Sequence, residues 1–359
     1  MIFHKKRLFL VLAVCVIVAA VILRVWLSGG ITVGSTAVQV DIEPGTSYQT
    51  LAYDKNVLLM SGEGVRAFNT AGQEVWKIQT ANTNPFIDVA GKYLLIGEMA
   101  GKSFSVYSGN KELRTCKPEN TLISAKLNKN GYVVMLCEEA GYKGLAVVQN
   151  PRGNEIFKWH SGEGYVVDAA LSDDNRYLAV AQIMTNKEKV YSRMIFFDIE
   201  KNEQVAAEER EDCIIAKVQF SNGGWVTVSD TEFLGFTKTG KLKYEVGFQG
   251  RTVSAFQIDN PNNMVFAFIN NQNNTVLEMY DKNGKLRGSY AASGELKNLS
   301  VEGEVILCSQ LRSVMYIDPA GRMRKSESIS HDMKSIQLFS DRKHAFVMGG
   351  NTADILKIR

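Results

Sequence analysis

The sequence predicts an all-β protein, an eight-bladed β-propeller whose ring is closed by a strand from its N-terminal side, preceded by one transmembrane helix. Two observations predict the ring: short apolar runs recur throughout residues 36–359, and a turn centred on Gly or Asn follows most of them. In addition, no long helical periodicity follows residue 30, which argues against an α/β fold. The net charge of +3 over 359 residues is small, so no nucleic-acid partner is expected.

An apolar segment near the N-terminus predicts the membrane helix. The run 8–27, LFLVLAVCVIVAAVILRVWL, provides the roughly twenty residues that a helix needs to cross a bilayer. Basic residues before the run keep the N-terminus in the cytoplasm by the positive-inside rule, and a cation and a Trp suit the far interface. The anchor residues are Lys5, Lys6, Arg7, Arg24 and Trp26. A signal peptide cleaved near Ser28 is the alternative.

The membrane segment divides the chain into four parts: a cytoplasmic tip at 1–7, the transmembrane helix at 8–27, a linker at 28–35 and the propeller at 36–359. The linker SGGITVGS spans at most about 26 Å when it is fully extended. The predicted localisation is therefore the cell membrane, single-pass, with the propeller outside the cytoplasm and close to the bilayer.

The recurring turn gives the repeat length. Its copies are NTAGQEVWKI, YSGNKELRT, NPRGNEIFKW, DIEKNEQVAA, TKTGKLKYEV, YDKNGKLRGS and DPAGRMRKS, centred on Gly72, Gly109, Gly153, Asn202, Gly240, Gly284 and Gly321. Successive centres are 37 to 49 residues apart, which is about the length of a four-stranded propeller blade. The turn YDKNG also resembles the start of a calcium loop. Gly284 comes two places too early for one, and Asn-Gly favours a hairpin, so no metal is expected.

Eight strand-like runs accompany the seven turns, and the last unit ends at Arg359 after three strands. The fourth strand can come from Thr36–Asp41, which pairs the two ends and removes an exposed sheet edge. Seven blades are the alternative. The four strands of blade six are predicted at 253–258, 264–269, 276–280 and 285–290.

These repeats resemble the eight-bladed propellers of the PQQ-like and WD40-like type. The chain is most similar to a bacterial family of single-pass membrane-anchored propellers of unknown function. Gly72 followed by Trp76 fits the outer turn of PQQ-like blades, and Phe157 and Tyr244 fit it in part. The Gly-His and Trp-Asp signatures of WD repeats are missing. The resemblance therefore implies the fold and carries over no cofactor-binding or catalytic residue.

The sequence contains no recognisable catalytic constellation. It has no P-loop, no Rossmann fingerprint and no HExxH motif, so no cofactor and no enzymatic activity are expected. Four cysteines lie in the predicted propeller: Cys116, Cys137, Cys213 and Cys308. Because Cys137 and Cys308 end apolar runs, we expect buried, reduced thiols rather than disulfides.

The loops on one face of the ring are the predicted binding site, because a rigid scaffold leaves binding to its loops. Blade four has the longest predicted loop there, 183–194, with a solvated hairpin as the alternative. The candidate partner-binding residues are Lys187, Lys189, Tyr191 and Arg193 of blade four, Glu138, Glu139, Tyr142 and Lys143 of blade three, and Arg312 of blade seven. The expected function is a non-catalytic scaffold that binds a protein partner in the cell envelope. The alternative is an enzyme or sensor that binds a small molecule or glycan in the central channel.

Overall fold

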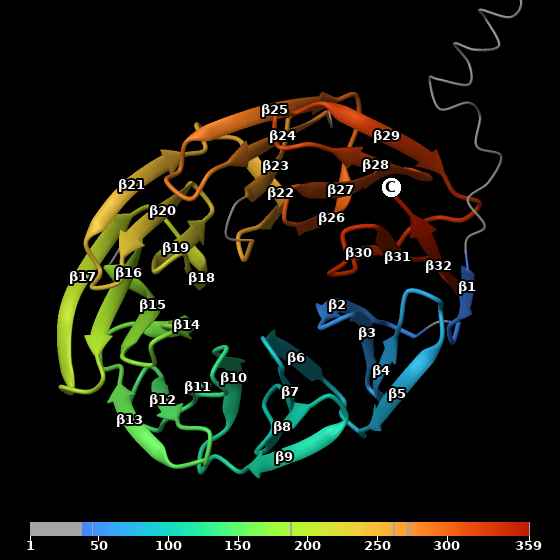
Figure 1. The fold of residues 1–359 in the computed structure, drawn as a ribbon. Helices are drawn as coiled ribbons and strands as arrows, with labels where there is room; N and C mark the ends of the chain where they lie inside the picture. Colours follow the sequence, from blue (N-terminus) through green and yellow to red (C-terminus); the bar gives the residue numbers. More distant parts are fainter. Residues whose placement is uncertain are drawn as a thin grey trace, which may run out of the picture. The chain divides into compact units, whose positions relative to one another are not determined.

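The computed structural model describes residues 38–44, 46–186, 189–260, 263–270, 272 and 274–358 (Figure 1). The predicted cytoplasmic tip, transmembrane helix and linker, with all five anchor residues, lie outside this range and remain predictions. Within the described residues, no helix is long and apolar enough to cross a membrane.

The described chain forms eight antiparallel sheets of four strands each, arranged as blades around a centre (Figure 1). Blades one and two are β2(Gln49–Tyr53), β3(Asn56–Ser61), β4(Gly64–Phe68), β5(Glu74–Gln79) and β6(Pro85–Ala90), β7(Tyr93–Glu98), β8(Phe104–Ser108), β9(Lys111–Cys116). Blades three and four are β10(Leu122–Leu127), β11(Val133–Cys137), β12(Leu145–Gln149), β13(Glu155–His160) and β14(Tyr165–Leu171), β15(Tyr177–Asn186), β16(Lys189–Asp198), β17(Glu203–Glu211).

Blades five and six are β18(Ile215–Ser221), β19(Gly224–Ser229), β20(Glu232–Thr237), β21(Leu242–Gly247) and β22(Thr252–Gln257), β23(Met264–Ile269), β24(Thr275–Tyr280), β25(Leu286–Ala292). Blades seven and eight are β26(Lys297–Glu302), β27(Val305–Gln310), β28(Ser313–Ile317), β29(Met323–Ser328) and β30(Ser335–Leu338), β31(His344–Met348), β32(Thr352–Lys357), β1(Val38–Asp41). The prediction of eight blades is confirmed, and the alternative of seven is wrong.

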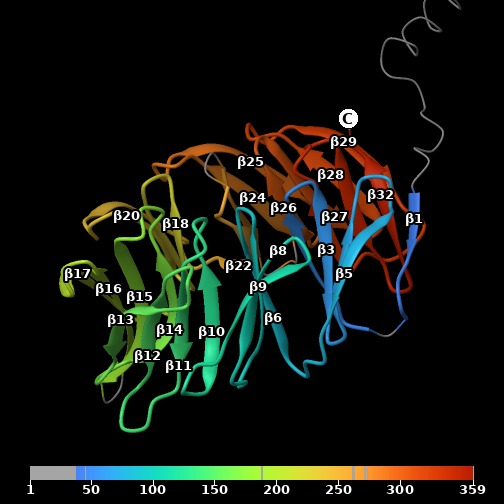
Figure 2. The ribbon, with the colours of Figure 1, turned by 60° about the horizontal axis from the view of Figure 1, so that its bottom comes forward.

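The ring closes as the sequence predicts. β1 is the outermost strand of blade eight and pairs antiparallel with β32, with Val38 opposite Ile355 and Asp41 opposite Thr352. Figure 2 shows β1 at the outer edge of the blade, beside β32. Val40 is 5% exposed and packs with residues of blades one and eight. The strand from the N-terminal side therefore both completes a sheet and fills the junction between the first and last blades.

The core consists of eight apolar clusters, one between each pair of neighbouring blades. The middle strands are buried on both faces, which explains why their sequences are continuous apolar runs rather than alternating ones. Between blades five and six, for example, the rings of Phe233 and Phe266 stack with centroids 4.6 Å apart. Each blade thus covers the apolar face of the next, as in other repeat architectures.

The recurring turn is a hairpin, as the sequence predicts. Asp281 Oδ1 accepts hydrogen bonds from the backbone N–H groups of Asn283 and Lys285, at 2.8 and 3.0 Å. Gly284 follows with a φ of 74°, which Gly adopts without strain. In three other blades Asn69, Asn150 and Asp318 accept the same pair of backbone bonds. The repeat seen in the sequence is therefore a side-chain-capped turn between the third and fourth strands.

Candidate functional site

The direction of the strands assigns every connection to one of two faces. In each antiparallel blade the chain runs from the innermost strand outward, except that the outermost strand of blade eight, β1, comes from the N-terminal side. The connections between second and third strands, and those between blades, therefore lie on one face, which we call the loop face. The connections between first and second strands, and between third and fourth strands, lie on the other, which we call the turn face.

On the loop face, the connections of blades two, three and four surround a hollow of about 710 Å³, the blade-three hollow. It is lined by Lys102, Glu119, Asn120, Thr121, Ile123, Glu138, Glu139, Ala140, Tyr142, Lys143, Gly144 and Tyr165. All four residues predicted on blade three are therefore brought together around one depression. Tyr165, the first residue of β14, belongs to the same set.

Two tyrosines expose their rings at the hollow. Tyr142 is 48% exposed and Tyr165 is 61% exposed, which is unusual for large aromatic side chains. The Tyr142 ring lies 4.6 Å from that of His160, centroid to centroid. Lys143 Nζ lies 4.7 Å above the Tyr165 ring and 3.2 Å from its hydroxyl oxygen. The tyrosines are thus held by neighbours while one side of each ring faces solvent.

Two acidic residues, Glu138 and Glu139, line the same hollow as these tyrosine rings. Asn120 Nδ2 donates hydrogen bonds to the Glu139 carboxylate and, at 2.8 Å, to the Glu138 backbone carbonyl. These bonds fix the connection after β11 against the one that precedes β10. The Glu138 side chain remains exposed. The hollow therefore presents apolar ring faces, carboxylates and the Lys143 ammonium within one depression.

Blade four carries a hairpin where the sequence predicted its longest loop. β15 and β16 pair as far as Asn186 opposite Lys189, so most of 183–194 is strand, as in the hairpin alternative. The reason is local: residues along the segment alternate in exposure, and Ser192 and Met194 point inward and are buried. Lys187 lies outside the described residues.

The two predicted cations of the hairpin that the structure describes, Lys189 and Arg193, have acidic partners within the chain. Arg193 bonds Glu163 at 3.0 Å and Glu209 at 2.5 Å, and Lys189 bonds Glu211 at 2.9 Å. Tyr191 is half-buried opposite Glu211. Because Glu163 lies two residues before Tyr165, Arg193 ties the hairpin to the edge of the blade-three hollow. The described cations of the hairpin are therefore paired, and Arg193 supports the hollow.

The structure does not bring Arg312 to this site. Arg312 lies between β27 and β28, across the ring from β11 and β12 (Figure 1). It pairs with Asp332 at 2.8 Å, and the neighbouring Leu311 is 90% exposed. The eight predicted residues that the structure describes thus form one cluster on blade three, an adjoining hairpin and one distant position.

The innermost strands enclose a central channel of about 760 Å³. Its lining includes charged residues from several blades, among them Asp88, Lys126, Lys217, Asp259 and Glu302, together with Phe220 and Phe256. Burial raises the pKa of Asp88, and it also raises that of Glu302, to which nearby Asp259 adds. The channel is therefore polar and charged rather than apolar.

Most of the charged groups deep in the channel form ion pairs or hydrogen bonds with other residues of the ring. Lys126 Nζ lies 2.5 Å from Asp168 Oδ1, and Asp88 accepts a 2.6 Å hydrogen bond from the backbone N–H of Leu127 in the next blade. Burial lowers the pKa of Lys126. Lys217 differs, since it has no ion pair with any described residue although it lines the channel. Within the described part of the chain, no group of three His, Cys, Asp or Glu residues could hold a metal ion.

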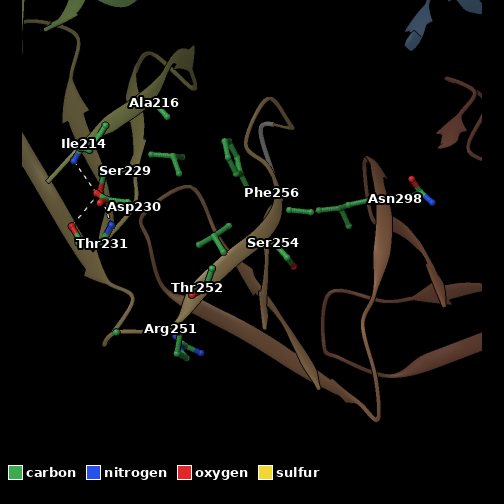
Figure 3. A pocket seen from close by; sticks show the side chains of 15 residues that line it. Ile214, Ala216, Ser229, Asp230, Thr231, Arg251, Thr252, Ser254, Phe256 and Asn298 are labelled. Atoms are coloured by element: carbon green, nitrogen blue, oxygen red, sulfur yellow. Dashed lines mark hydrogen bonds between the residues drawn. The ribbon is translucent and has the colours of Figure 1, made fainter. Parts of the chain in front are cut away.

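A second cavity, of about 740 Å³, lies between blades five and six and was missed by the sequence reasoning. Figure 3 shows Thr252, Ser254 and Phe256 of β22 on one side and Ile214, Ala216 and Asp230 of blade five on the other. Asp230 accepts a 2.8 Å hydrogen bond from the Ile214 N–H, which fixes this wall. Phe256 lines both this cavity and the central channel, so the two adjoin.

Arg251 lies at the edge of this cavity, but its guanidinium already binds partners within blade six. Its guanidinium bonds Glu278 at 2.6 and 3.1 Å and lies 3.9 Å above the Phe268 ring. The hydrogen bonds that Arg251 donates to the Glu278 carboxylate raise the pKa of Arg251, so its charge is permanent. The remaining lining is largely apolar, which suits an uncharged surface rather than an ion.

The two faces of the ring differ in charge. In the described connections of the turn face the cations are Lys55, Lys92, Lys129, Arg152, Arg176, Lys201, Lys238, Lys241, Lys282, Lys285, Arg322, Arg342 and Lys343, and the acids are Asp54, Asp173, Asp174, Glu200, Asp259, Asp281, Glu304, Asp318 and Asp341. On the loop face the cations are Lys102, Lys117, Lys143, Arg251, Arg312 and Lys334, and the acids are Glu43, Glu63, Glu119, Glu138, Glu139, Glu163, Asp212, Asp230, Glu295 and Asp332. The turn face is therefore net basic and the loop face net acidic.

The fold defines the class of this protein: eight four-stranded blades in a closed ring make it an eight-bladed β-propeller. The family follows from the sequence. Residues 32–358 match the model of a family of unknown function, DUF5711, so the chain belongs to that family. A comparison with curated proteins gave no match.

Solved structures show the same fold at low sequence identity. The computationally designed protein Ika8 is 13% identical with a TM-score of 0.62, over 89% of this chain and 99% of that one. The C-terminal WD40 domain of Sif2 is 10% identical with a TM-score of 0.60, over 90% and 99%. BamB from Moraxella catarrhalis is 9% identical with a TM-score of 0.54, over 89% and 100%. At these identities the likeness concerns the fold alone.

Proposed function

We propose that this chain is a non-catalytic, membrane-anchored binding protein of the cell envelope, with its propeller outside the cytoplasm. Its partner is a protein that docks on the loop face at the blade-three hollow. The observation that carries this proposal is the exposure of Tyr142 and Tyr165 side by side with charged residues around one depression. Exposed tyrosines that their neighbours hold in place are typical anchors of protein interfaces, because they lose little conformational freedom on binding.

The anchor is part of the proposal. The apolar run 8–27 and the preceding basic residues support a single membrane helix with a cytoplasmic N-terminus. The partner would then be an envelope protein rather than a nucleic acid. The acidic character of the loop face favours a partner with a basic or neutral docking surface.

The proposal can be tested by crosslinking followed by affinity capture of the full chain from its native membrane. The variant Tyr142→Ala/Tyr165→Ala should lose the captured partner, because both ring faces are removed. The matched control is Ile156→Ala, which removes another exposed apolar side chain, 41% exposed, from the outer strand of blade three. Equal capture by all three proteins would contradict the proposal.

A second function is supported by the central channel. A propeller sensor or enzyme that binds a small molecule or glycan needs a polar cavity, and 760 Å³ lies within the size range of ligand sites. The unpaired Lys217 would receive an anionic group there. Glucuronate should then raise the melting temperature of the protein but not that of Lys217→Met. Absence of a shift in the native protein would count against this function for anionic sugars.

A further inference from the structure

The turn face holds a set of cations without acidic partners. Of its exposed lysines, Lys55, Lys92, Lys241, Lys282, Lys285 and Lys343 form no ion pair with any described residue. The other cations of this face are mostly paired, such as Lys129 with Asp173 at 2.6 Å. The free lysines come from the connections of blades one, two, five, six and eight, so the positive charge is spread around the ring rather than gathered in one cleft. A distribution of this kind suits an extended anionic surface better than a single anionic group.

The chain also enters the ring on this face. β32 begins after the connection 349–351 of the loop face and runs to the turn face, and β1 is antiparallel to it. Val38, the first described residue, therefore lies at the turn face. Its neighbour confirms this position: a Cβ placed on Gly72, in the outer turn of blade one, would come within 2.5 Å of Val38 Cγ1.

Ten residues separate Leu27, the last residue of the apolar run, from Val38. A segment of this length spans at most about 35 Å. If residues 8–27 cross the bilayer, the face where Val38 lies is the one that the linker holds nearest to the lipid headgroups. The charge of that face and the position of Val38 on it are independent observations, and both favour the same contact.

We propose that the turn face of the propeller docks on an anionic phospholipid surface, which leaves the acidic loop face and the blade-three hollow directed away from the membrane. Lysines near an anionic bilayer each add attraction that falls off within a Debye length, so the contact requires a short distance and is weakened by added salt. This inference rests on the proposed anchor for its geometry. It goes beyond the proposed function because it assigns a lipid partner to the face opposite the protein-binding site.

The test uses the full chain in nanodiscs of phosphatidylcholine or phosphatidylglycerol, labelled with an amine-reactive reagent and read by mass spectrometry. Labelling of Lys55, Lys241, Lys282 and Lys285 should fall several-fold in the phosphatidylglycerol discs and return at high salt. Lys102, Lys117 and Lys334 are exposed loop-face lysines that form no ion pair with any residue the structure describes, and they serve as internal controls that should label equally in both discs. The charge-reversed variant Lys241→Glu/Lys282→Glu/Lys285→Glu should lose the protection of the remaining turn-face lysines, with its β-sheet circular dichroism unchanged.

The outcomes separate this inference from the anchor. Incorporation into both discs with equal labelling of the two faces would overturn the lipid contact and leave the anchor standing. Association with phosphatidylglycerol discs alone, reversed by salt, would support the lipid contact and contradict the anchor. Failure to associate with either disc would overturn both.

Discussion

Lys126 and Asp168 join the innermost strands of neighbouring blades, with the lysine Nζ 2.5 Å from the Asp168 Oδ1 atom. The other oxygen of Asp168 accepts a 2.7 Å hydrogen bond from the Val218 N–H in blade five. One carboxylate thus links three blades, just inside the strands that carry the blade-three hollow and its supporting hairpin. It fixes the inner wall of the ring where the proposed binding site is built.

Replacing this carboxylate should destabilise the ring. Asp168→Ala leaves the largely buried Lys126 ammonium and the Val218 N–H without their partner, so we expect a loss of about 3 kcal/mol in the free energy of unfolding. Denaturant titration measures it. The control Lys129→Ala removes an exposed ion pair with Asp173 and should cost less than about 1 kcal/mol. Similar losses in both variants would mean that the inner pair does not bind the blades together.

Ring closure can be tested within a single strand. Val40 of β1 is buried between blades one and eight, whereas Gln39 beside it is exposed. Val40→Asp places a carboxylate in an apolar junction and should lower the free energy of unfolding by about 3 kcal/mol, while Gln39→Asp should change it by less than about 0.5 kcal/mol. Thermal unfolding of both variants gives the comparison. If the two behaved alike, β1 would not contribute to closing the ring.

The four described cysteines should be inert thiols in the folded protein. All are buried and unpaired, and burial raises the pKa of Cys137 to about 11 and that of Cys308 to about 12. Since the thiolate is the reactive species, a thiol reagent should not label these residues at neutral pH until denaturant is added. Mass spectrometry of the labelled peptides identifies each site. Rapid labelling of Cys137 or Cys308 without denaturant would contradict the described packing.

Acid should weaken blade four through Asp198. Arg176 donates hydrogen bonds of 3.0 and 2.6 Å to this carboxylate, and they lower its pKa from the ordinary value of 3.8. A depressed folded-state pKa stabilises the protein above the unfolded-state pKa, and this stability is lost as the pH falls through the lower folded-state value. Between about pH 5 and about pH 3, the native protein should therefore lose more stability than Asp198→Asn. Parallel melting curves for the two proteins would contradict the role of this pair.

The ring itself could be predicted from the sequence because each of its turns and strands is specified by residues that are neighbours in the chain. The turn centres all adopt positive φ, from 55° at Asn202 to 87° at Gly240, as capped hairpins require. In blade six the second strand is Met264–Ile269, as predicted, and the first is Thr252–Gln257, shifted by one residue. The fourth extends to Ala292, two residues beyond its predicted end. These small errors lie at strand ends, where local signals are weakest.

The site was predicted only in part, because its residues meet across blades. Glu138, Glu139, Tyr142 and Lys143 share one connection and were found together. Tyr165 joins them from the next blade, and the alternation in its strand gave no sign that its ring stays exposed. Similarly, the partners of Arg193 are Glu163 and Glu209, which lie 30 and 16 residues away in the sequence. The register between strands decides such pairs, and the sequence pattern alone does not specify it.

Site-specific photo-crosslinking in the native membrane tests the central claim, that the blade-three hollow binds a protein partner. A photoreactive phenylalanine replaces Tyr142 or Tyr165 in one set of proteins and Ile156, on the outer strand of the same blade, in the other. We predict the same crosslinked protein from both tyrosine positions and none from position 156. Crosslinks of equal yield from all three positions, or none from either tyrosine position, would contradict the claim.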